Sequence, residues 1–293
     1  MRLPAGKVII TAALNGAIAR KKDNPNVPEQ PEEIARAAAE CYEAGAAIVH
    51  IHARDEQGMP CGTRQKFAEI MAAVRAECDE IVVQFSTGGG SNLTIEERVS
   101  CLEAMPEMAS LNMGTLMRQT GPQAGVPFAN LTKDIEAWAA KMKNLGIKPE
   151  MECYSQSMFR DVRNLIAKGL VDPPYYVNFV LGMAYQGGIE ASPETLVSMH
   201  QFLPEGCYFN TTATGAAQLP LTTMGMVMGG AIRVGLEDNI NYSRGVPAQS
   251  SAQLVERSVR IAGELNIEPA TPDEAREILG VTRRQAPREP ERQ

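Results

Sequence analysis

The sequence lacks any run of about 20 apolar residues, and its N-terminus shows no basic, apolar and small-residue leader. It also lacks an excess of basic residues, since the formal net charge is -7. Proteins bind nucleic acids and anionic membranes through surplus lysine and arginine, so this charge argues against both kinds of partner. The composition, 44% hydrophobic and 22% charged, predicts a soluble cytoplasmic protein.

Paired cysteines are missing as well. The six cysteines are scattered without a C-x-x-C pair, which is typical of reduced thiols in a cytosolic enzyme rather than of a disulfide framework. Histidine is scarce, with three in the chain, yet His50 and His52 both lie in the apolar stretch AAIVHIHARD. Two titratable rings in an apolar run make this stretch the first candidate for a functional site.

Short apolar, β-branched runs alternate with helical stretches along the chain. We predict eight strands, at residues 8–13, 47–52, 81–85, 108–113, 149–153, 175–181, 207–212 and 231–236. Helix starts are marked by the proline at Pro31 and by hydroxyl caps followed by acids at Thr94, Ser192 and Thr271. Residues 254–265 carry the spacing of a further amphipathic helix.

Eight strands alternating with helices in about 250 structured residues predict a (β/α)8 barrel, also called a TIM barrel. We expect one barrel domain over residues 1–284 and a disordered polar tail over 285–293. A doubly wound open sheet is the alternative architecture.

Side-chain alternation within the strands favours the barrel. Val49 and Ile51 share one strand face, and His50 and His52 share the other. The same split separates apolar residues from a polar set: Gln84, Ser86, Ser110, Asn112, Glu150, Glu152, Asn178, Arg233 and Glu237. A polar inner face predicts a site near the carboxyl ends of the strands. In an antiparallel sheet, the same residues would merely face water.

His50 and His52, two apart on a strand, project their rings side by side, so both imidazoles can bind one cation. The remaining histidine, His200, lies in a helical stretch, which makes a carboxylate the expected third ligand. The candidates are Glu150, Glu152, Glu237, Asp55 and Asp238. Glu237 is favoured because it lies at the end of the eighth strand on the face of Arg233; an internal Arg233–Glu237 salt bridge is the alternative.

Two loops are further candidates. The glycine-rich residues 86–91 follow the third strand and can offer backbone N–H groups to a carboxylate or thioester, or can simply be a flexible loop. Residues 15–22 combine Asn15-Gly16 with Arg20-Lys21-Lys22, which indicates either a cofactor phosphate contact or a solvated loop.

The chain resembles the β-keto acid cleavage enzymes. The matching segments are VIITAALNGA, PEEIARAAAECYEAGAAIVHIHARD, QFSTGGG, SLNMGT, KPEMECY and AIRVGLEDN, in this order and up to about residue 265. The resemblance implies a zinc-dependent (β/α)8 barrel, usually a homotetramer, in which a β-keto acid and acetyl-CoA become acetoacetate and a new acyl-CoA.

The resemblance also implies roles for residues of this chain. His50, His52 and Glu237 would bind zinc, and Asp238 with Arg233 would promote removal of the C2 proton. The substrate carboxylate and keto oxygens would be held by Ser86, Gly89, Ser110 and Asn112, with Glu150 nearby.

Two positions depart from the family pattern. Members acting on amino-bearing keto acids carry an acidic residue where this chain has Ile18, so we expect a substrate whose distal part is uncharged or is recognised elsewhere. The seventh strand reads NTTATG in place of a WS-type segment, which leaves the shape of the acyl chain open.

Three other functions remain open at this point. The protein could be a metal-dependent aldolase-type lyase or a hydrolase, each with a barrel fold and a reaction that does not use CoA. It could also be a metal-stabilised structural or sensing barrel, which would not be an enzyme. The set His50, His52, Glu237, Arg233 and Asp238 argues against the structural protein, because a purely structural metal does not need the last two.

Overall fold

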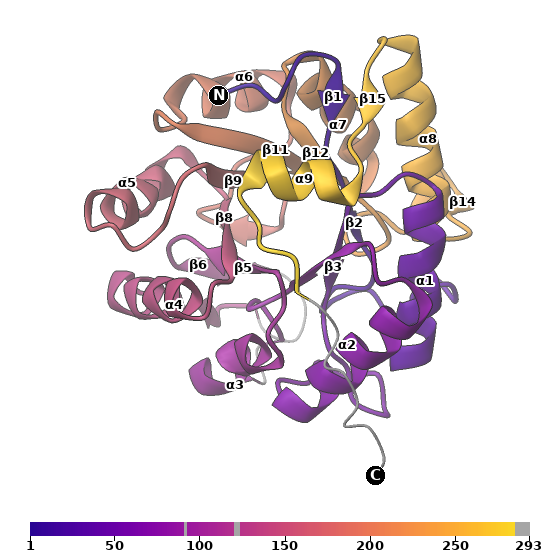
Figure 1. Ribbon diagram of the computed structural model, residues 1–293, viewed down its shortest axis with the longest axis horizontal. Helices are drawn as coiled ribbons and strands as arrows, with labels where there is room; N and C mark the ends of the chain where they lie inside the picture. The colour runs from indigo at the N-terminus through magenta and orange to yellow at the C-terminus, as the bar shows by residue number, and fades with distance from the viewer. Residues whose placement is uncertain (91–92, 120–123, 285–293) are drawn as a thin grey trace.

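The computed structural model describes residues 1–90, 93–119 and 124–284, and the predicted tail 285–293 lies outside them. Eight parallel strands close into a barrel in the order β11-β12-β2-β3-β4-β5-β8-β9 (Figure 1). The barrel strands are β2 (Ile10–Ala13), β3 (Ile48–Ile51), β4 (Val82–Phe85), β5 (Met108–Asn112), β8 (Lys148–Cys153), β9 (Tyr175–Leu181), β11 (Cys207–Ala213) and β12 (Ala231–Val234). Each overlaps one predicted strand, so the (β/α)8 class is confirmed and the open sheet is wrong.

Helices surround this barrel. They are α1 (Pro31–Glu43), α2 (Arg64–Glu77), α3 (Ile95–Val99), α4 (Thr132–Asn144), α5 (Phe159–Ala167), α6 (Pro193–Phe202), α7 (Gln218–Val227), α8 (Ser251–Glu264) and α9 (Pro272–Leu279). The predicted starts are confirmed: Pro31 opens α1, the Ser192 hydroxyl caps α6, and Thr94 and Thr271 form capping boxes before α3 and α9.

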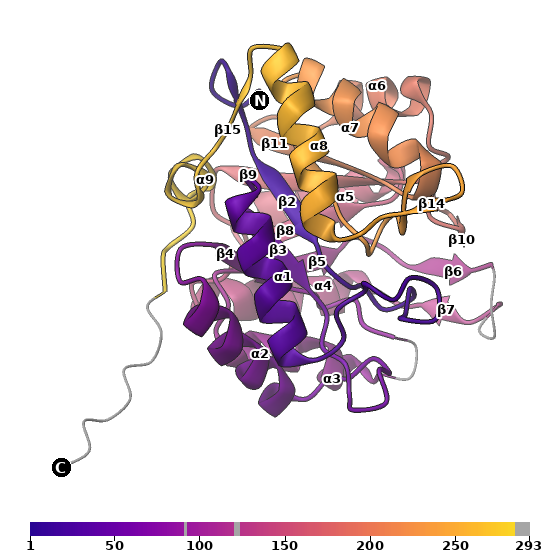
Figure 2. The ribbon, with the colours of Figure 1, turned by 90° about the vertical axis from the view of Figure 1, so that its right-hand side faces the viewer.

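The outward strand face packs against the helices, as its alternation predicts. Val49 and Ile51 are fully buried members of the main hydrophobic core. A second, smaller core fills the amino-terminal end of the barrel, where Ile9, Ile48 and Val82 meet Leu279 of α9. Figures 1 and 2 show α9 lying across this end of the barrel.

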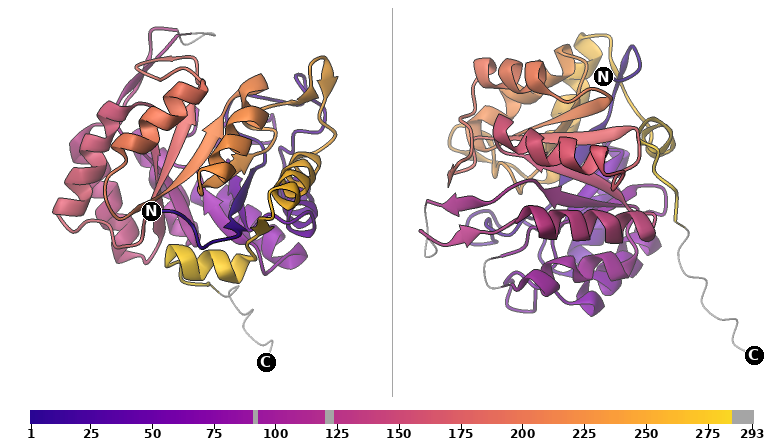
Figure 3. Two further views of the ribbon diagram at one scale, coloured as in Figure 1. Left: turned by 90° about the horizontal axis from the view of Figure 1, so that it is seen from above. Right: turned by 90° about the vertical axis from the view of Figure 1, so that its left-hand side faces the viewer.

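Three small sheets complete the molecule. β6 (Leu116–Arg118), β7 (Pro127–Phe128) and β10 (Tyr185–Gln186) form one sheet, β13 (Asn241–Ser243) pairs with β14 (Val246–Pro247), and β1 (Lys7–Val8) pairs with β15 (Glu268–Pro269). Figures 2 and 3 place the first two sheets at the end of the barrel opposite α9, where the barrel strands finish. Loops at this end carry the chemistry in TIM barrels.

Across the described ranges, no helix is both long and apolar enough to cross a bilayer.

Candidate active site

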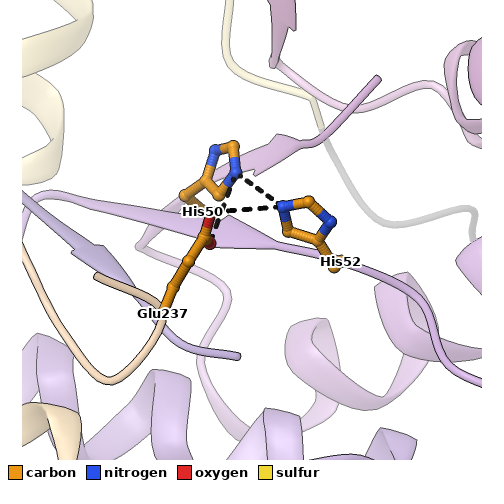
Figure 4. Close-up of side chains that lie close together, drawn as sticks. All are labelled: His50, His52 and Glu237. Carbon is orange, nitrogen blue, oxygen red and sulfur yellow. Dashed lines mark hydrogen bonds and ion pairs between the residues drawn. The ribbon is translucent and has the colours of Figure 1, made fainter. Parts of the chain in front are cut away.

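Three predicted metal ligands converge at the carboxyl end of the barrel. The Nε2 atoms of His50 and His52 lie 3.2 Å apart. A Glu237 carboxylate oxygen lies 3.6 Å from His50 Nε2, and the other lies 3.3 Å from His52 Nε2. Figure 4 shows the two rings and the carboxylate pointing at one another. The three residues therefore form one compact group of donor atoms.

The spacing of these donors fits a metal ion. Zinc bonds nitrogen and oxygen at about 2.0–2.1 Å, so two ligands of a tetrahedral ion lie about 3.3–3.4 Å apart. The three separations in the structure, 3.2, 3.3 and 3.6 Å, bracket that value. Two imidazoles and one carboxylate also match the donor set of catalytic zinc with an open fourth position. The group can thus hold zinc or a similar divalent ion.

The His50 ring is in the protonation state that metal binding requires. Its Nδ1 lies 2.7 Å from Gln84 Oε1, and because an amide oxygen only accepts, Nδ1 carries the proton and Nε2 presents a lone pair. Burial, with the nearby Arg233 charge, lowers the pKa of His50 to about 3. The ring is therefore neutral, which is the form that binds metals.

Glu237 is ionised. Burial opposes its charge, but Arg233 outweighs burial and holds the Glu237 pKa well below its usual range. Arg233 Nη2 lies 2.6 Å from Glu237 Oε1. The predicted Arg233–Glu237 salt bridge and the predicted metal ligand set are therefore both present in the geometry, and they do not exclude each other.

Glu237 lies in a different element from the expected one, which was the end of the eighth strand. The eighth strand ends at Val234, two residues before its predicted end. Gly235 then adopts φ +135°, and the Glu237 amide donates to the carbonyl oxygen of Ala13 at 3.2 Å. Glu237 thus lies in a turn after β12 and not on the strand face of Arg233, because the left-handed glycine ends the strand.

Arg233 contacts the remaining acidic groups. Its guanidinium donates to both Asp238 oxygens at 2.8 and 3.0 Å and to Glu152 at 3.3 Å. Burial raises the pKa of Asp238 to about 6 and that of Glu152 to about 8, although Arg233 favours both charged forms. Asp238 and Arg233, predicted as a proton-transfer dyad, are thus in direct contact beside Glu237.

The predicted substrate-binding residues line one side of His52. Ser86 and Ser110 Oγ atoms lie 3.5 Å apart, and both residues are buried. A Cβ placed on Gly88 would lie 3.1 Å from Ser86 Oγ, 3.7 Å from His52 Cε1 and 3.9 Å from Asn112 Nδ2. These side chains therefore converge on one small volume next to the candidate metal centre.

Some of the polar atoms around this volume already have hydrogen-bond partners within the protein. Ser86 Oγ accepts from the Gly88 amide at 3.0 Å, and Ser110 Oγ accepts from the Thr87 amide at 3.2 Å. Asn112 Oδ1 accepts from the Tyr154 hydroxyl at 2.8 Å, which leaves the buried Asn112 Nδ2 as an unpaired donor. Gly89 adopts φ +62°, so the loop needs glycine there.

Glu150 lies in the polar interior of the barrel, close to His50. It is fully buried, and its Oε1 accepts from Asn210 Nδ2 at 3.1 Å. Burial raises its pKa, while the amides of Asn210, Asn178 and Gln84 oppose that change. Glu150, Glu152 and His50 form a second close group of donor atoms; Glu150 Oε1 accepts from Asn210 and Glu152 from Arg233, whereas the buried Glu150 Oε2 has no partner among the described residues. The structure places Glu150 in a polar layer beneath the candidate metal centre.

The basic loop after β2 has internal partners. Lys21 Nζ lies 2.5 Å from Glu33, and Arg20 Nε lies 3.9 Å from Glu29. Ile18, in the same loop, is 70% exposed at the rim. His200, the third histidine, lies in α6 with its ring centroid 4.9 Å from that of Phe209, away from the metal ligands.

Several residues beside the site were not predicted to orient the candidate ligands. Gln84 was visible on the polar strand face, but its contact with His50 depends on the register of β3 against β4, in which the two residues are paired. Asn15 and Arg54 lie in loops, where strand alternation gives no signal. Tyr154 follows β8 and ends the segment KPEMECY, but nothing in that segment indicates that its hydroxyl donates to Asn112.

The fold and site define an enzyme with a closed (β/α)8 barrel and, at its catalytic end, a candidate metal centre made of two histidines and one glutamate. The chain belongs to the β-keto acid cleavage enzyme family, whose model matches residues 7–281. The resemblance seen in the sequence motifs is thereby confirmed.

Individual relatives support this family assignment. The 3-keto-5-aminohexanoate cleavage enzyme of Acetoanaerobium sticklandii is 40% identical over 277 residues, which cover 94% of this chain and 99% of the relative. The 3,5-dioxohexanoate:acetyl-CoA acetone transferase of Paraburkholderia graminis is 34% identical over 298 residues, covering 93% and 95%. Among solved structures, the apo structure of ObcA has a TM-score of 0.74 at 18% identity, covering 88% of this chain and 66% of that one, and shows the fold alone.

Proposed function

We propose that this enzyme is a zinc-dependent transferase that converts a β-keto acid and acetyl-CoA into acetoacetate and a new acyl-CoA. The observation that carries the proposal is the convergence of His50, His52 and Glu237 beside the Arg233–Asp238 pair. Family membership supports it, as do relatives named for acetyl-CoA-dependent transfer.

Binding of the keto acid falls to the residues beside His52. The unpaired Nδ2 of Asn112 and the hydroxyls of Ser86 and Ser110 would donate to the carboxylate and keto oxygens, and Gly89 lets the backbone approach closely. Glu150 would act from below, by keeping the amides around His50 in place. Zinc, when bound by His50, His52 and Glu237, would supply Lewis acidity toward the ketone.

Proton transfer falls to Asp238. Its carboxylate would take the C2 proton while Arg233, bonded to both of its oxygens, holds it in place. The C2 carbon then attacks the thioester carbonyl of acetyl-CoA, forms a carbon–carbon bond and expels the CoA thiolate. That thiolate attacks the original ketone carbon, the bond between C2 and C3 breaks, and C2 regains a proton. Acetoacetate and the new acyl-CoA leave.

The distal part of the substrate is expected to carry no positive charge. Ile18 is exposed at the rim and offers no carboxylate to an ammonium group. A panel of β-keto acids, with acetoacetate formation as the readout, tests this point. High turnover of 5-amino-3-oxohexanoate with poor turnover of simple 3-oxo acids would overturn it, and Ile18→Glu should improve the amino-bearing substrate.

The metal and the CoA dependence are tested together. We expect His50→Ala and Glu237→Ala to lose bound zinc and activity while the circular dichroism spectrum is retained, and His200→Ala to keep both. Unfolding of the first two variants would point to a structural metal instead. Cleavage of the keto acid without acetyl-CoA would contradict the transferase and favour a lyase or hydrolase.

A further inference from the structure

A buried arginine beside the site has no role in the proposed chemistry. Arg54 follows β3, two residues after His52, and is fully buried. All of its hydrogen-bond partners in the described part of the chain are backbone carbonyl oxygens: Gly58 at 2.7 Å, Asn15 at 3.2 Å, Gly16 at 2.7 Å and Ala19 at 2.6 Å. A buried charge bound only by carbonyls is expensive, so these contacts need an explanation.

The bonded carbonyls belong mainly to one loop. Asn15, Gly16 and Ala19 follow β2, whereas Arg54 and Gly58 follow β3. The planar guanidinium has several donors in a fixed arrangement, so a single side chain can hold three carbonyls of one loop in a fixed orientation. Arg54 therefore ties the loop after β2 to the segment that carries His52.

The tied loop touches two metal ligands. The Asn15 amide group donates to the His52 carbonyl at 2.9 Å and accepts from the His52 amide at 3.0 Å, so it fixes the His52 backbone from both sides. Gly16, at φ +60°, lies against Glu237: a Cβ there would be 2.5 Å from Glu237 Cγ. His52 and Glu237 come from distant parts of the sequence, and this loop lies against both.

We propose that Arg54 is a positioning residue for the metal centre, acting through the Asn15–Gly16 backbone on His52 and Glu237. The inference rests on the proposed metal site, which it deepens. Ile18 lies between the bonded carbonyls of Gly16 and Ala19, so the rim side chain can vary while the contacts that orient the ligands remain.

The test measures metal affinity directly, by competition for Zn²⁺ against a chromogenic chelator with the folded, metal-depleted protein. Arg54→Lys keeps the charge but loses the fork of donors, and we expect it to weaken Zn²⁺ binding by about 10- to 100-fold, the usual effect of removing an outer partner of a metal ligand. Arg75→Lys is the matched control, because Arg75 is also buried and donates to backbone carbonyls, at the amino-terminal end of β4. It should lower the melting temperature and leave Zn²⁺ affinity unchanged.

Asn15→Ala provides a second measurement, which decides the matter if Arg54→Lys does not fold. It should also weaken Zn²⁺ binding, and the double variant should lose less than the product of the two single losses, because both act through one loop. Wild-type affinity in Asn15→Ala and in any folded Arg54→Lys would overturn the inference. Equal Zn²⁺ affinity in the wild type and Glu237→Ala would instead show that the proposed metal site is wrong.

Discussion

Gln84 determines how His50 presents itself to a metal. Its Oε1 accepts from Nδ1, so the lone pair of the ring is on Nε2, the atom that faces His52 and Glu237. Such outer hydrogen bonds fix both the tautomer and the ring orientation of a ligand histidine. One amide in the neighbouring strand therefore controls one of the three candidate ligands.

We predict that Gln84→Met weakens Zn²⁺ affinity by about 10- to 100-fold. The variant keeps the side-chain length but removes the acceptor, so the His50 ring can rotate or change tautomer. Zn²⁺ competition against a chelator, with the fold checked by circular dichroism, measures the change.

Asn210→Leu is the matched control for Gln84→Met. Asn210 lies in the same buried polar layer and donates to Glu150, but no hydrogen bond joins it to His50 among the described contacts. We expect its Zn²⁺ affinity to stay within about twofold of wild type, since it orients no ligand. Equal losses in the two variants would mean that general packing of the layer, rather than the His50 hydrogen bond, governs metal affinity.

Residue-level prediction from the sequence succeeded where a period of two was enough. His50 and His52 were assigned to one strand face and Val49 and Ile51 to the other, and the structure confirms this split. The sequence could not predict which residues pair across neighbouring strands. The Gln84–His50 contact depends on the register between β3 and β4, and the sequence of either strand alone does not determine that register. The deep position of Glu150, too, depends on how eight strands close together.

At the scale of elements, the turn after β12 brings Glu237 to the site. Gly235 has φ +135°, and a Cβ at this position would lie 2.1 Å from the Ala13 carbonyl oxygen. That oxygen also accepts from the Glu237 amide. The close approach of the two backbones requires glycine, and it sets the distance between Glu237 and the two histidines, of which His50 lies in β3 and His52 directly after it.

We predict that Gly235→Ala destabilises the protein by at least about 3 kcal/mol and weakens Zn²⁺ binding, because the clash pushes the Glu237 turn away from β2. Urea unfolding and Zn²⁺ competition measure the two effects. Gly245→Ala is the control: Gly245 has φ +75° with nothing within 4 Å, so only backbone strain of about 1–2 kcal/mol is expected, without a change in affinity. A Gly235→Ala variant no less stable than Gly245→Ala would show that the turn adapts.

The turn after β12 was not predicted because the sequence does not show where this strand ends. The run AIRVGL reads as one continuous strand over 231–236, yet pairing stops at Val234. Glycine inside a strand pattern can mark a close backbone approach or a weak strand position, and the neighbouring strand decides between them. Helix starts were easier, because the capping residues at Thr94 and Thr271 act on their own helices.

The whole molecule separates stability from chemistry along the barrel axis. At the amino-terminal end, the fully buried charge of Glu107 is matched by Arg75 at 3.0 Å and by Arg276 of α9 at 3.1 Å. Together with the smaller core, this network joins α9 to the barrel. Asn112 Nδ2, a buried donor without a partner, and the converging ligands lie at the other end. Substitutions at the α9 end should therefore change stability and leave the metal centre intact.

Lys148 makes this stability depend on pH. It opens β8 at the amino-terminal end and donates to the Asp172 carbonyl at 2.9 Å, and burial lowers its pKa from 10.5 to about 8. Between these two pH values the unfolded chain binds a proton that the folded chain does not. Folding therefore gains stability from Lys148 as the pH rises through this window, and the destabilising effect of the buried charge is full below pH 8.

We predict that the stability of the wild type relative to Lys148→Met increases by about 1–2 kcal/mol, or roughly 2–3 °C in melting temperature, between pH 7 and pH 10. Comparing the two proteins at each pH removes the contribution of the buried cysteines and of any bound metal, which both share. Zn²⁺ affinity should be equal in the two proteins at every pH, since Lys148 lies far from the ligands along the barrel axis. A stability difference that stays constant with pH would show that Lys148 titrates normally in the folded protein, and one that falls would reverse the sign derived from its burial.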